Sequence, residues 1–343
     1  MKLYILHLLI LSLGTSHYSG HKGQVNPVND CIPGSEIKQD FPFDNGEYGI
    51  ITVSVADARL EPSHSAEMGT QLLLGMPLKI IRQAGWWQIK TPEDYVAWIE
   101  KSSFVRMDKK SFNQWINAKK VIFTDDYGFA YETPDERKQR ASDLVFGNLL
   151  KWEGETKKFF YVSYPDGRKA YVLKTQARLF DQWHASLRLT EQSIVQTALT
   201  MKGIPYVWGG TSVKGMDCSG FVKTVFLKHG IILRRDAWQQ AQTGKPVEIS
   251  AGYDNLRPGD LLFFGKKAIG DTAEKIRHVA IYIGNKEFIH SAGYVKINSL
   301  DPNQPNYDEV NTREFIRASR IIGAVGGEGI RTINEHPMYR LQE

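Results

Sequence analysis

The sequence predicts an α+β protein in which two small all-β barrels precede a domain of helices and antiparallel strands. Its 343 residues are too many for one typical domain, since most domains hold roughly 100–200 residues. A pattern of short alternating strands occurs twice before residue 187, and helical spacing of apolar residues replaces it afterwards. With 42% hydrophobic and 24% charged residues, the composition is that of a globular protein and argues against disorder or several membrane spans.

Charge and cysteine content exclude several kinds of site. The formal net charge is +5, but Lys and Arg are scattered along the chain, so no nucleic-acid partner is expected. Cys31 and Cys218 are the only two cysteines, which rules out a disulfide framework and a four-cysteine zinc site. No metal or cofactor is expected, and because nothing in the sequence requires an obligate partner, a monomer is expected.

The N-terminus resembles an export signal. A basic start at Lys2 is followed by an apolar run over residues 3–13 and by small residues at Gly14 and Ser16. Residues 1–16 are therefore predicted to be a signal peptide cleaved after Ser16, and the run is too short to span a bilayer. An amphipathic first helix is the alternative, but the run is apolar on all sides. The mature chain is expected in the periplasm or outside the cell, with residues 17–45 as a flexible lead-in that contains a non-catalytic Cys31.

Residues 46–107 and 108–185 are predicted to be two copies of one β-rich unit. Pro62 and Pro134 are separated by 72 positions, as are Gly75 and Gly147, and later pairs such as Trp98 and Tyr171 by 73. A constant offset with one slip indicates a duplicated unit. Each copy holds short alternating runs between turn residues, which favours a small antiparallel barrel. Such barrels bind peptides or cell-wall polymers, or serve only as spacers, and the repeat alone does not decide between these roles.

Residues 186–325 carry the candidate chemistry, and residues 326–343 are expected to be a tail. Thr190 is the expected N-cap of a helix that stops at Gly203, with a hydrophobic staple between Leu189 and Ile194. A Gly-rich loop then leads to Cys218, which is predicted to lie at the N-terminus of a second helix. Unpaired N–H groups and the helix dipole stabilise a thiolate at that position, so Cys218 is a candidate nucleophile.

A thiol nucleophile needs a proton acceptor, and two histidines lie on a predicted hairpin. His278 and His290 flank the turn signal Gly284-Asn285-Lys286. A three-residue loop would place His290 opposite position 280 and diagonal to His278 on the same face, whereas a two-residue loop would place the histidines on opposite faces. An odd-length loop is therefore predicted. Unrelated strand histidines are the alternative, but two on one hairpin beside a helix-capping cysteine favour a catalytic pair.

These residues together resemble the NlpC/P60 family of cysteine peptidases over roughly residues 188–325. The resemblance implies a papain-like α+β fold and hydrolysis of amide bonds in peptidoglycan stem peptides. It implies that Cys218 is the nucleophile, His278 the general base and acid, His290 the group that orients His278, and Tyr206 a donor to the oxyanion. The motifs are Tyr206-x-Trp208-Gly209-Gly210, Asp217-Cys218-Ser219-Gly220-Phe221, Arg257-Pro258-Gly259-Asp260-Leu261-Leu262-Phe263-Phe264, His278-Val279-Ala280-Ile281-Tyr282-Ile283-Gly284 and Phe288-Ile289-His290-Ser291.

The first β unit resembles bacterial SH3-like domains, and the second does so more weakly. The motifs in the first unit are Gly75-x-Pro77-Leu78-Lys79-Ile80, Trp86-Trp87 and Tyr95-x-x-Trp98. The full arrangement is similar to the γ-D-glutamyl-L-diamino acid endopeptidases, also called dipeptidyl-peptidases VI. These release L-Ala-γ-D-Glu from wall peptides with a free N-terminal alanine, and their first SH3-like domain helps to close the amine end of the site.

The same similarity assigns the substrate contacts. Glu67 and Tyr95 would reach the substrate amine with Asp236 as a second acid, and Arg235 would pair with the α-carboxylate of γ-D-Glu. Ala237 stands where relatives are expected to have Ser, so one substrate hydrogen bond is in doubt. The implied substrate-binding residues are Glu67, Tyr95, Trp208, Asp217, Ser219, Arg235 and Asp236.

Each of these residues also has a structural interpretation. Glu67 could be a solvated loop charge and Tyr95 a core or rim aromatic. Asp217 and Asp236 could simply cap the helices that follow them, and Ser219 could satisfy a helix end.

Three hypotheses for the whole chain follow from the sequence. The first is a dipeptide-releasing peptidase of wall peptides, which requires Glu67 and Tyr95 to lie near Cys218. The second is an NlpC/P60 endopeptidase of intact, glycan-attached stems, for which that proximity is not needed. The third is a non-catalytic wall-binding protein, which the presence of Cys218, His278 and His290 disfavours.

Overall fold

The structure is a computed structural model that describes residues 47–270 and 272–339. The predicted signal peptide, the lead-in with Cys31, and residues 340–343 of the tail lie outside the described residues.

The first β unit is a seven-stranded antiparallel sheet with strand order β3-β2-β6-β5-β4-β1-β7. Its apolar positions alternate along the strands, and the inward side chains form one closed core that includes Leu72, Leu78 and Ile89. A short 3₁₀ turn at Lys101–Ser103 precedes the last strand. The strands are β1 Tyr48–Ile51, β2 Val55–Arg59, β3 Met68–Leu73, β4 Pro77–Ala84, β5 Trp86–Lys90, β6 Val96–Ile99 and β7 Phe104–Met107.

The second β unit repeats this topology strand for strand. Its order is β10-β9-β13-β12-β11-β8-β14, which is the first order with each strand number raised by seven. The predicted duplication and the two small all-β barrels are therefore confirmed. The strands are β8 Lys120–Phe123, β9 Tyr127–Tyr131, β10 Arg140–Val145, β11 Leu149–Glu155, β12 Phe159–Ser163, β13 Lys169–Leu173 and β14 Ala177–Leu179.

One helix precedes the second sheet in the chain and another follows it. Helix α1 (Lys109–Asn117), which the sequence placed in the second unit, packs against β1 and β7 of the first. Its buried Phe112 and Trp115 cover Ile50, so the helix completes the first core. Helix α2 (Phe180–Ser186) packs against β8 and β14 and leads into the last third of the chain.

Equivalent turns of the two barrels meet each other. Gly75 and Gly147 both have left-handed backbone, with φ of +80° and +87°. The backbone N–H of Leu149 donates to the Leu74 carbonyl at 2.8 Å, and the Asn148 side chain donates to the Ser54 carbonyl at 2.8 Å. A Cβ atom on Gly75 would lie 2.2 Å from the carbonyl oxygen of Leu149, so this contact requires glycine.

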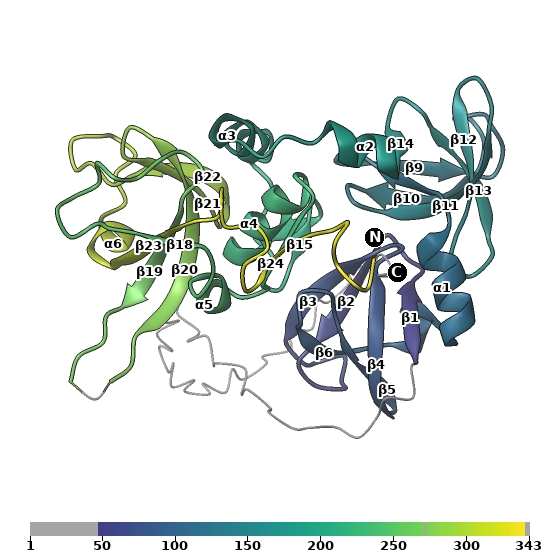
Figure 1. Ribbon diagram of the computed structural model, residues 1–343, viewed down its shortest axis with the longest axis horizontal. Coiled ribbons are helices and arrows are strands. Elements are labelled where there is room, and N and C mark those ends of the chain that lie inside the picture. Colours follow the sequence, from purple (N-terminus) through teal and green to yellow (C-terminus); the bar gives the residue numbers. More distant parts are fainter. Residues whose placement is uncertain (1–46, 271, 340–343) are drawn as a thin grey trace, which may run out of the picture. The chain divides into compact units, whose positions relative to one another are not determined.

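The last third is an α+β unit built on a six-stranded antiparallel sheet of order β18-β23-β19-β20-β21-β22. Helix α4 (Cys218–Leu227) packs against β20 and β21, and α5 (Ala237–Gln240) against β20, as Figure 1 shows. The sheet strands are β18 Lys245–Val247, β19 Leu261–Lys266, β20 Lys275–Gly284, β21 Glu287–Ala292, β22 Tyr294–Ser299 and β23 Phe315–Arg320. The other elements are β15 Thr211–Ser212, β16 Gly215–Met216, β17 Ile231–Leu233, α6 Glu309–Arg313 and β24 Ile330–Thr332.

The helix predicted after Thr190 is confirmed. Helix α3 spans Glu191–Thr200, and the Thr190 hydroxyl accepts the backbone N–H of Ser193 at 3.1 Å in a capping box. Leu189 packs against the cluster that contains Ile194, as a hydrophobic staple requires. Apolar side chains of α3 and α4 and of the sheet share this cluster, which is the core of the unit.

Part of the expected tail is ordered against the rest of the chain. Strand β24 pairs with β17, and the ring of His336 forms a 2.8 Å hydrogen bond with the carbonyl of Pro92 in the first barrel. Within residues 47–270 and 272–339, no helix is both long enough and apolar enough to cross a membrane.

The contact between the two barrels predicts unequal effects of two glycine substitutions. Gly85 also has left-handed backbone (φ +72°), but a Cβ there would meet nothing within 4 Å. Gly85→Ala should therefore lower the free energy of unfolding by about 1 kcal/mol, through backbone strain alone. Gly75→Ala should lower it by about 2–4 kcal/mol, because the Leu149 backbone must also move. Urea unfolding of both variants measures the difference, and equal losses would show that the close approach does not stabilise the protein.

Candidate active site

Cys218 is the first residue of α4 and is 9% exposed. Its place at a helix N-terminus is as predicted. The Asp217 side chain occupies the N-cap position and accepts the backbone N–H of Gly220 at 2.7 Å. The thiol therefore lies where the helix dipole favours a thiolate.

The two histidines form a direct pair. Nε2 of His278 lies 2.7 Å from Nδ1 of His290, in a hydrogen bond between two buried rings. Their strands pair in the predicted register, with Ile281 opposite Ile289, so both rings lie on one face of the sheet. The predicted same-face arrangement is confirmed.

The predicted odd-length hairpin loop is wrong. Gly284 pairs with Glu287, which leaves a two-residue loop of Asn285 and Lys286, and both loop residues have left-handed backbone. A β-bulge at Ile283 then shifts the register by one residue and returns both histidines to the same face. A bulge changes which residues share a face just as an added loop residue would, so loop length alone does not determine the faces of His278 and His290.

Backbone contacts bring the Cys218 segment to the histidine strands. The Ser291 hydroxyl, next to His290, donates to the carbonyl of Met216 at 2.7 Å, two residues before Cys218. Tyr206 is tied to the same end of the hairpin, because its backbone N–H donates to the Gly293 carbonyl at 2.9 Å. Cys218 also shares a buried cluster with apolar side chains on either side of His278 in β20. The structure therefore brings the chain segments of Cys218 and Tyr206 against the hairpin that carries His278 and His290.

Burial keeps both imidazoles neutral near pH 7. It lowers the pKa of His290 to about 4, and it lowers the pKa of His278 well below its ordinary value, with a further contribution from His290. A neutral imidazole retains a lone pair, so this pair can accept a proton from a thiol.

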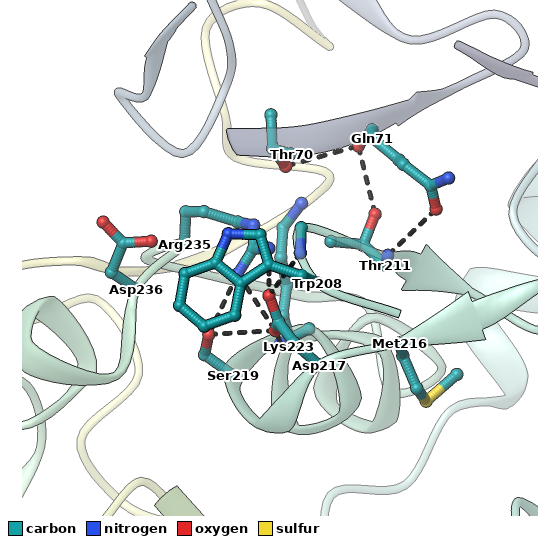
Figure 2. A network of polar contacts seen from close by, with 12 residues as sticks. Thr70, Gln71, Trp208, Thr211, Met216, Asp217, Ser219, Lys223, Arg235 and Asp236 are labelled. Carbon is teal, nitrogen blue, oxygen red and sulfur yellow. Dashed lines mark hydrogen bonds and ion pairs between the residues drawn. The ribbon is translucent and has the colours of Figure 1, made fainter. Parts of the chain in front are cut away.

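Asp217 forms a polar network with Arg235 and Ser219, drawn in Figure 2. Arg235 is 1% exposed, and its two terminal nitrogens contact the Asp217 carboxylate at 3.2 and 2.5 Å. One of these nitrogens also donates to the Ser219 hydroxyl at 2.9 Å. The Asp217 carboxylate accepts the backbone N–H of Gly209 as well, at 3.0 Å. Arg235 is thus already engaged with a carboxylate of its own chain.

Glu67 and Tyr95 of the first barrel lie beside this network. The indole N–H of Trp208 donates to the Glu67 carboxylate, and Trp208 is 40% exposed. Burial raises the pKa of Tyr95 above its ordinary value, and the charge of Asp236 raises it further. These interactions bring the side chains predicted to bind the amine into one region.

Asp236 is the N-cap residue of α5, so the helix-capping interpretation also holds for its position. Its backbone N–H donates to the Gln239 side chain at 3.0 Å. Burial raises the pKa of Asp236, and although Arg235 opposes this shift, Asp217 and Glu67 add to it. Ala237 is the first residue of the helix and offers no hydroxyl.

Sequence reasoning missed the contacts that attach the first barrel to this region. Lys223 of α4 and Glu93 of the β5–β6 turn form a buried ion pair at 2.5 Å, with side chains 7% and 1% exposed. Gln71 accepts the backbone N–H of Thr211 at 3.1 Å, as Figure 2 shows. Neither pair has a local sequence signal, because the partners are 130 and 140 positions apart.

Asn298 was also missed, although its position carried a signal. Its side-chain oxygen lies 2.9 Å from Nε2 of His290. It has the same parity as His290 on the next strand of the meander, which places it on the same face. Among the described residues, no group of three His, Cys, Asp or Glu side chains is arranged to hold a metal ion.

Comparisons with known proteins identify two regions. The NlpC/P60 family profile matches residues 203–315, and the bacterial dipeptidyl-peptidase SH3 domain profile matches residues 59–104. The chain is 30% identical to the γ-D-glutamyl-L-lysine dipeptidyl-peptidase of Bacillus subtilis over 68% of this chain and 76% of the relative. It is 28% identical to dipeptidyl-peptidase 6 of Lysinibacillus sphaericus over 75% of this chain and 93% of that one.

A crystal structure of an NlpC/P60 family protein from Bacillus cereus has the same fold. It superposes with a TM-score of 0.67 at 24% identity and covers 80% of this chain and 99% of its own.

The buried ion pair between Glu93 and Lys223 predicts that the free energy of unfolding falls in acid. Burial opposes the charge of Glu93, but Lys223 outweighs it and lowers the pKa of Glu93 below 4.5. The pair therefore stabilises the fold above pH 4.5, and this contribution is lost as the pH falls through the lowered pKa. Glu93→Gln should lower the free energy of unfolding at pH 7 by about 3–5 kcal/mol, because Lys223 is left buried and unpaired. The variant should also lose less stability than the parent on acidification.

A matched control is the exposed pair between Glu47 and Arg106, whose side chains are 45% and 49% exposed. Glu47→Gln should cost about 0–1 kcal/mol. Denaturant unfolding of both variants between pH 3 and 7 tests the comparison, and equal costs at pH 7 would contradict it.

Proposed function

Since the chain belongs to the NlpC/P60 family of peptidases, we propose that it cleaves wall peptides with a free N-terminal alanine. The bond hydrolysed is the amide between γ-D-Glu and the diamino acid of a peptidoglycan stem, and the product is L-Ala-γ-D-Glu. Relatives named for dipeptidyl-peptidase activity align along 68–75% of the chain, and the bacterial dipeptidyl-peptidase SH3 domain profile matches the first barrel, which together support the proposal. An exported protein in the periplasm or outside the cell would meet this substrate.

The proposed reaction is acyl transfer through a thioester. The Cys218 thiol transfers its proton to His278, and its sulfur attacks the γ-carbonyl carbon of the substrate. The Tyr206 hydroxyl and the Cys218 backbone N–H stabilise the oxyanion, and His278 then protonates the leaving amine. Water, activated by the now neutral His278, hydrolyses the thioester and restores the thiol. His290 holds the ring of His278 throughout.

The hydrogen bond between Trp208 and Glu67 is the observation that carries the substrate assignment. It ties an acid of the first barrel to the loop that leads into Cys218, where Asp236 adds a second carboxyl and Tyr95 a hydroxyl. A free α-ammonium would neutralise these acids, and it would lower the raised pKa of Asp236. A stem still attached to glycan has an uncharged amide at this position, which cannot offset the negative charge of Glu67 and Asp236.

The geometry favours a holding role for Arg235. Both of its terminal nitrogens are engaged with Asp217, so direct pairing with the substrate carboxylate would require an existing buried ion pair to open. We assign Arg235 and Asp217 to shaping the γ-D-Glu subsite. Trp208 and the Ser219 hydroxyl would then line that subsite.

A paired cleavage assay tests the proposal. Purified protein is given L-Ala-γ-D-Glu-diamino acid peptide with a free amine, and the same peptide N-acetylated, with products identified by mass. We expect cleavage of the free peptide alone and no cleavage by Cys218→Ala. Equal cleavage of both peptides would show that a free N-terminal amine is not required, and would favour an endopeptidase acting on intact stems.

Glu67→Gln tests the amine contact itself. The variant removes the charge and keeps the shape, so kcat/KM for the free peptide should fall roughly 10- to 100-fold. Glu61→Gln is the matched control, because Glu61 is exposed in the same loop between β2 and β3. Equal effects of the two substitutions would contradict the assignment of Glu67.

A further inference from the structure

We infer that Asn298 is a positioning residue that fixes the tautomers of both histidines through a chain of hydrogen bonds beginning at a backbone carbonyl. This inference rests on the proposed function for its catalytic meaning. Asn298 lies on β22, where Phe288 pairs with Asn298 and His290 with Lys296, so its side chain shares a face with His290. Its oxygen is 2.9 Å from Nε2 of His290, and its nitrogen is 2.9 Å from the carbonyl oxygen of Asn306.

The Asn306 carbonyl decides which way the Asn298 amide points. A backbone carbonyl can only accept a hydrogen bond, so the Asn298 NH₂ group must face it. The reversed amide would place two oxygens in contact and leave the NH₂ group facing the ring. The Asn298 oxygen therefore faces His290 and accepts from Nε2–H.

Because the Asn298 oxygen fixes the proton of His290 on Nε2, it also determines where His278 carries its proton. A neutral His290 that carries its proton on Nε2 has a lone pair on Nδ1. That lone pair accepts from Nε2–H of His278 across the 2.7 Å contact. The proton of His278 is thereby held on Nε2, and its Nδ1 keeps the lone pair that can receive a proton. The Asn306 carbonyl, three hydrogen bonds away from His278, thus sets which nitrogen of His278 acts as the base.

The chain of hydrogen bonds from the Asn306 carbonyl through Asn298 and His290 to His278, here called the relay, carries no net charge, and both of its rings are buried. His290 is 1% exposed, and burial lowers its pKa to about 4. The charged groups that act on the two rings are Asp308, which raises the pKa of His290, Lys296, which lowers the pKa of both, and Arg277, which lowers that of His278. An amide is suited to this position because it accepts from His290 without adding a buried negative charge.

Asn298→Leu removes the relay with little change of volume. Without the acceptor, His290 can place its proton on either nitrogen, and kcat/KM should fall roughly 10- to 100-fold with little change in KM. Asn303→Ala is the matched control, because Asn303 is an exposed asparagine in the loop that follows β22 and its side chain contacts Asp301 rather than either histidine. It should leave kcat/KM unchanged.

Asn298→Asp is expected to shift the pH dependence of kcat/KM, which would not change if Asn298 served only to stabilise the fold. A carboxylate still accepts from His290 but adds negative charge beside the pair, which favours proton binding by both rings. The pH profile of kcat/KM should therefore move to higher pH by about one unit or more. This variant also keeps the inference testable if Asn298→Leu does not fold.

Alkylation of Cys218 by iodoacetamide measures, without any substrate, how Asn298 affects the transfer of the thiol proton to His278. The modified peptide is identified by mass, which separates Cys218 from Cys31, and the rate is followed against pH for each variant. We expect a slower rate for Asn298→Leu, a shift to higher pH for Asn298→Asp and the parent profile for Asn303→Ala. Parent-like profiles for both Asn298 variants would overturn the relay. Failure of the parent to cleave stem peptides would overturn the proposed substrate but leave the alkylation result to decide the relay.

Discussion

The carboxylate of Asp217 is the constraint on which the rest of the site depends. It accepts hydrogen bonds from the helix that begins at Cys218, from the loop at Gly209, and from the side chains of Ser219 and Arg235. These donors come from three separate stretches of chain, and one buried anion brings them together. The thiol has a defined position because Asp217 holds the start of α4, and the loop at Gly209 is held by the same carboxylate.

The first barrel is a structural part of this site. Several contacts join it to the last third of the chain, and three of them lie close to Asp217: Gln71 with Thr211, Glu93 with Lys223, and Glu67 with Trp208. These contacts differ in kind. Gln71 binds a backbone N–H, Glu93 and Lys223 form a buried ion pair, and Glu67 accepts from the exposed indole of Trp208. The ion pair and the backbone contact fix the barrel in place, and this allows Glu67 to present a charge at a constant position.

Much of this arrangement was predictable from the sequence because it depends on local rules. Apolar alternation and a fixed offset gave the two barrels, and capping residues gave the starts of α3 and α4. The shared face of His278 and His290 was predicted, but the loop was not, because a bulge at Ile283 has no clear local signature. Contacts such as Glu93 with Lys223 could not be predicted, because an ion pair between distant segments depends on how whole units pack.

The separation of Glu93 and Lys223 in the sequence also has a consequence for folding. The barrel strands are synthesised first, and the ammonium that pairs with Glu93 comes 130 residues later. Until α4 docks, that carboxylate remains hydrated, because burying it alone would be too costly. Burial of Glu93 therefore marks a late step, in which α4 and the barrel lose water together. A chain folding from its N-terminus thus docks the first barrel and fixes the position of Cys218 in the same event.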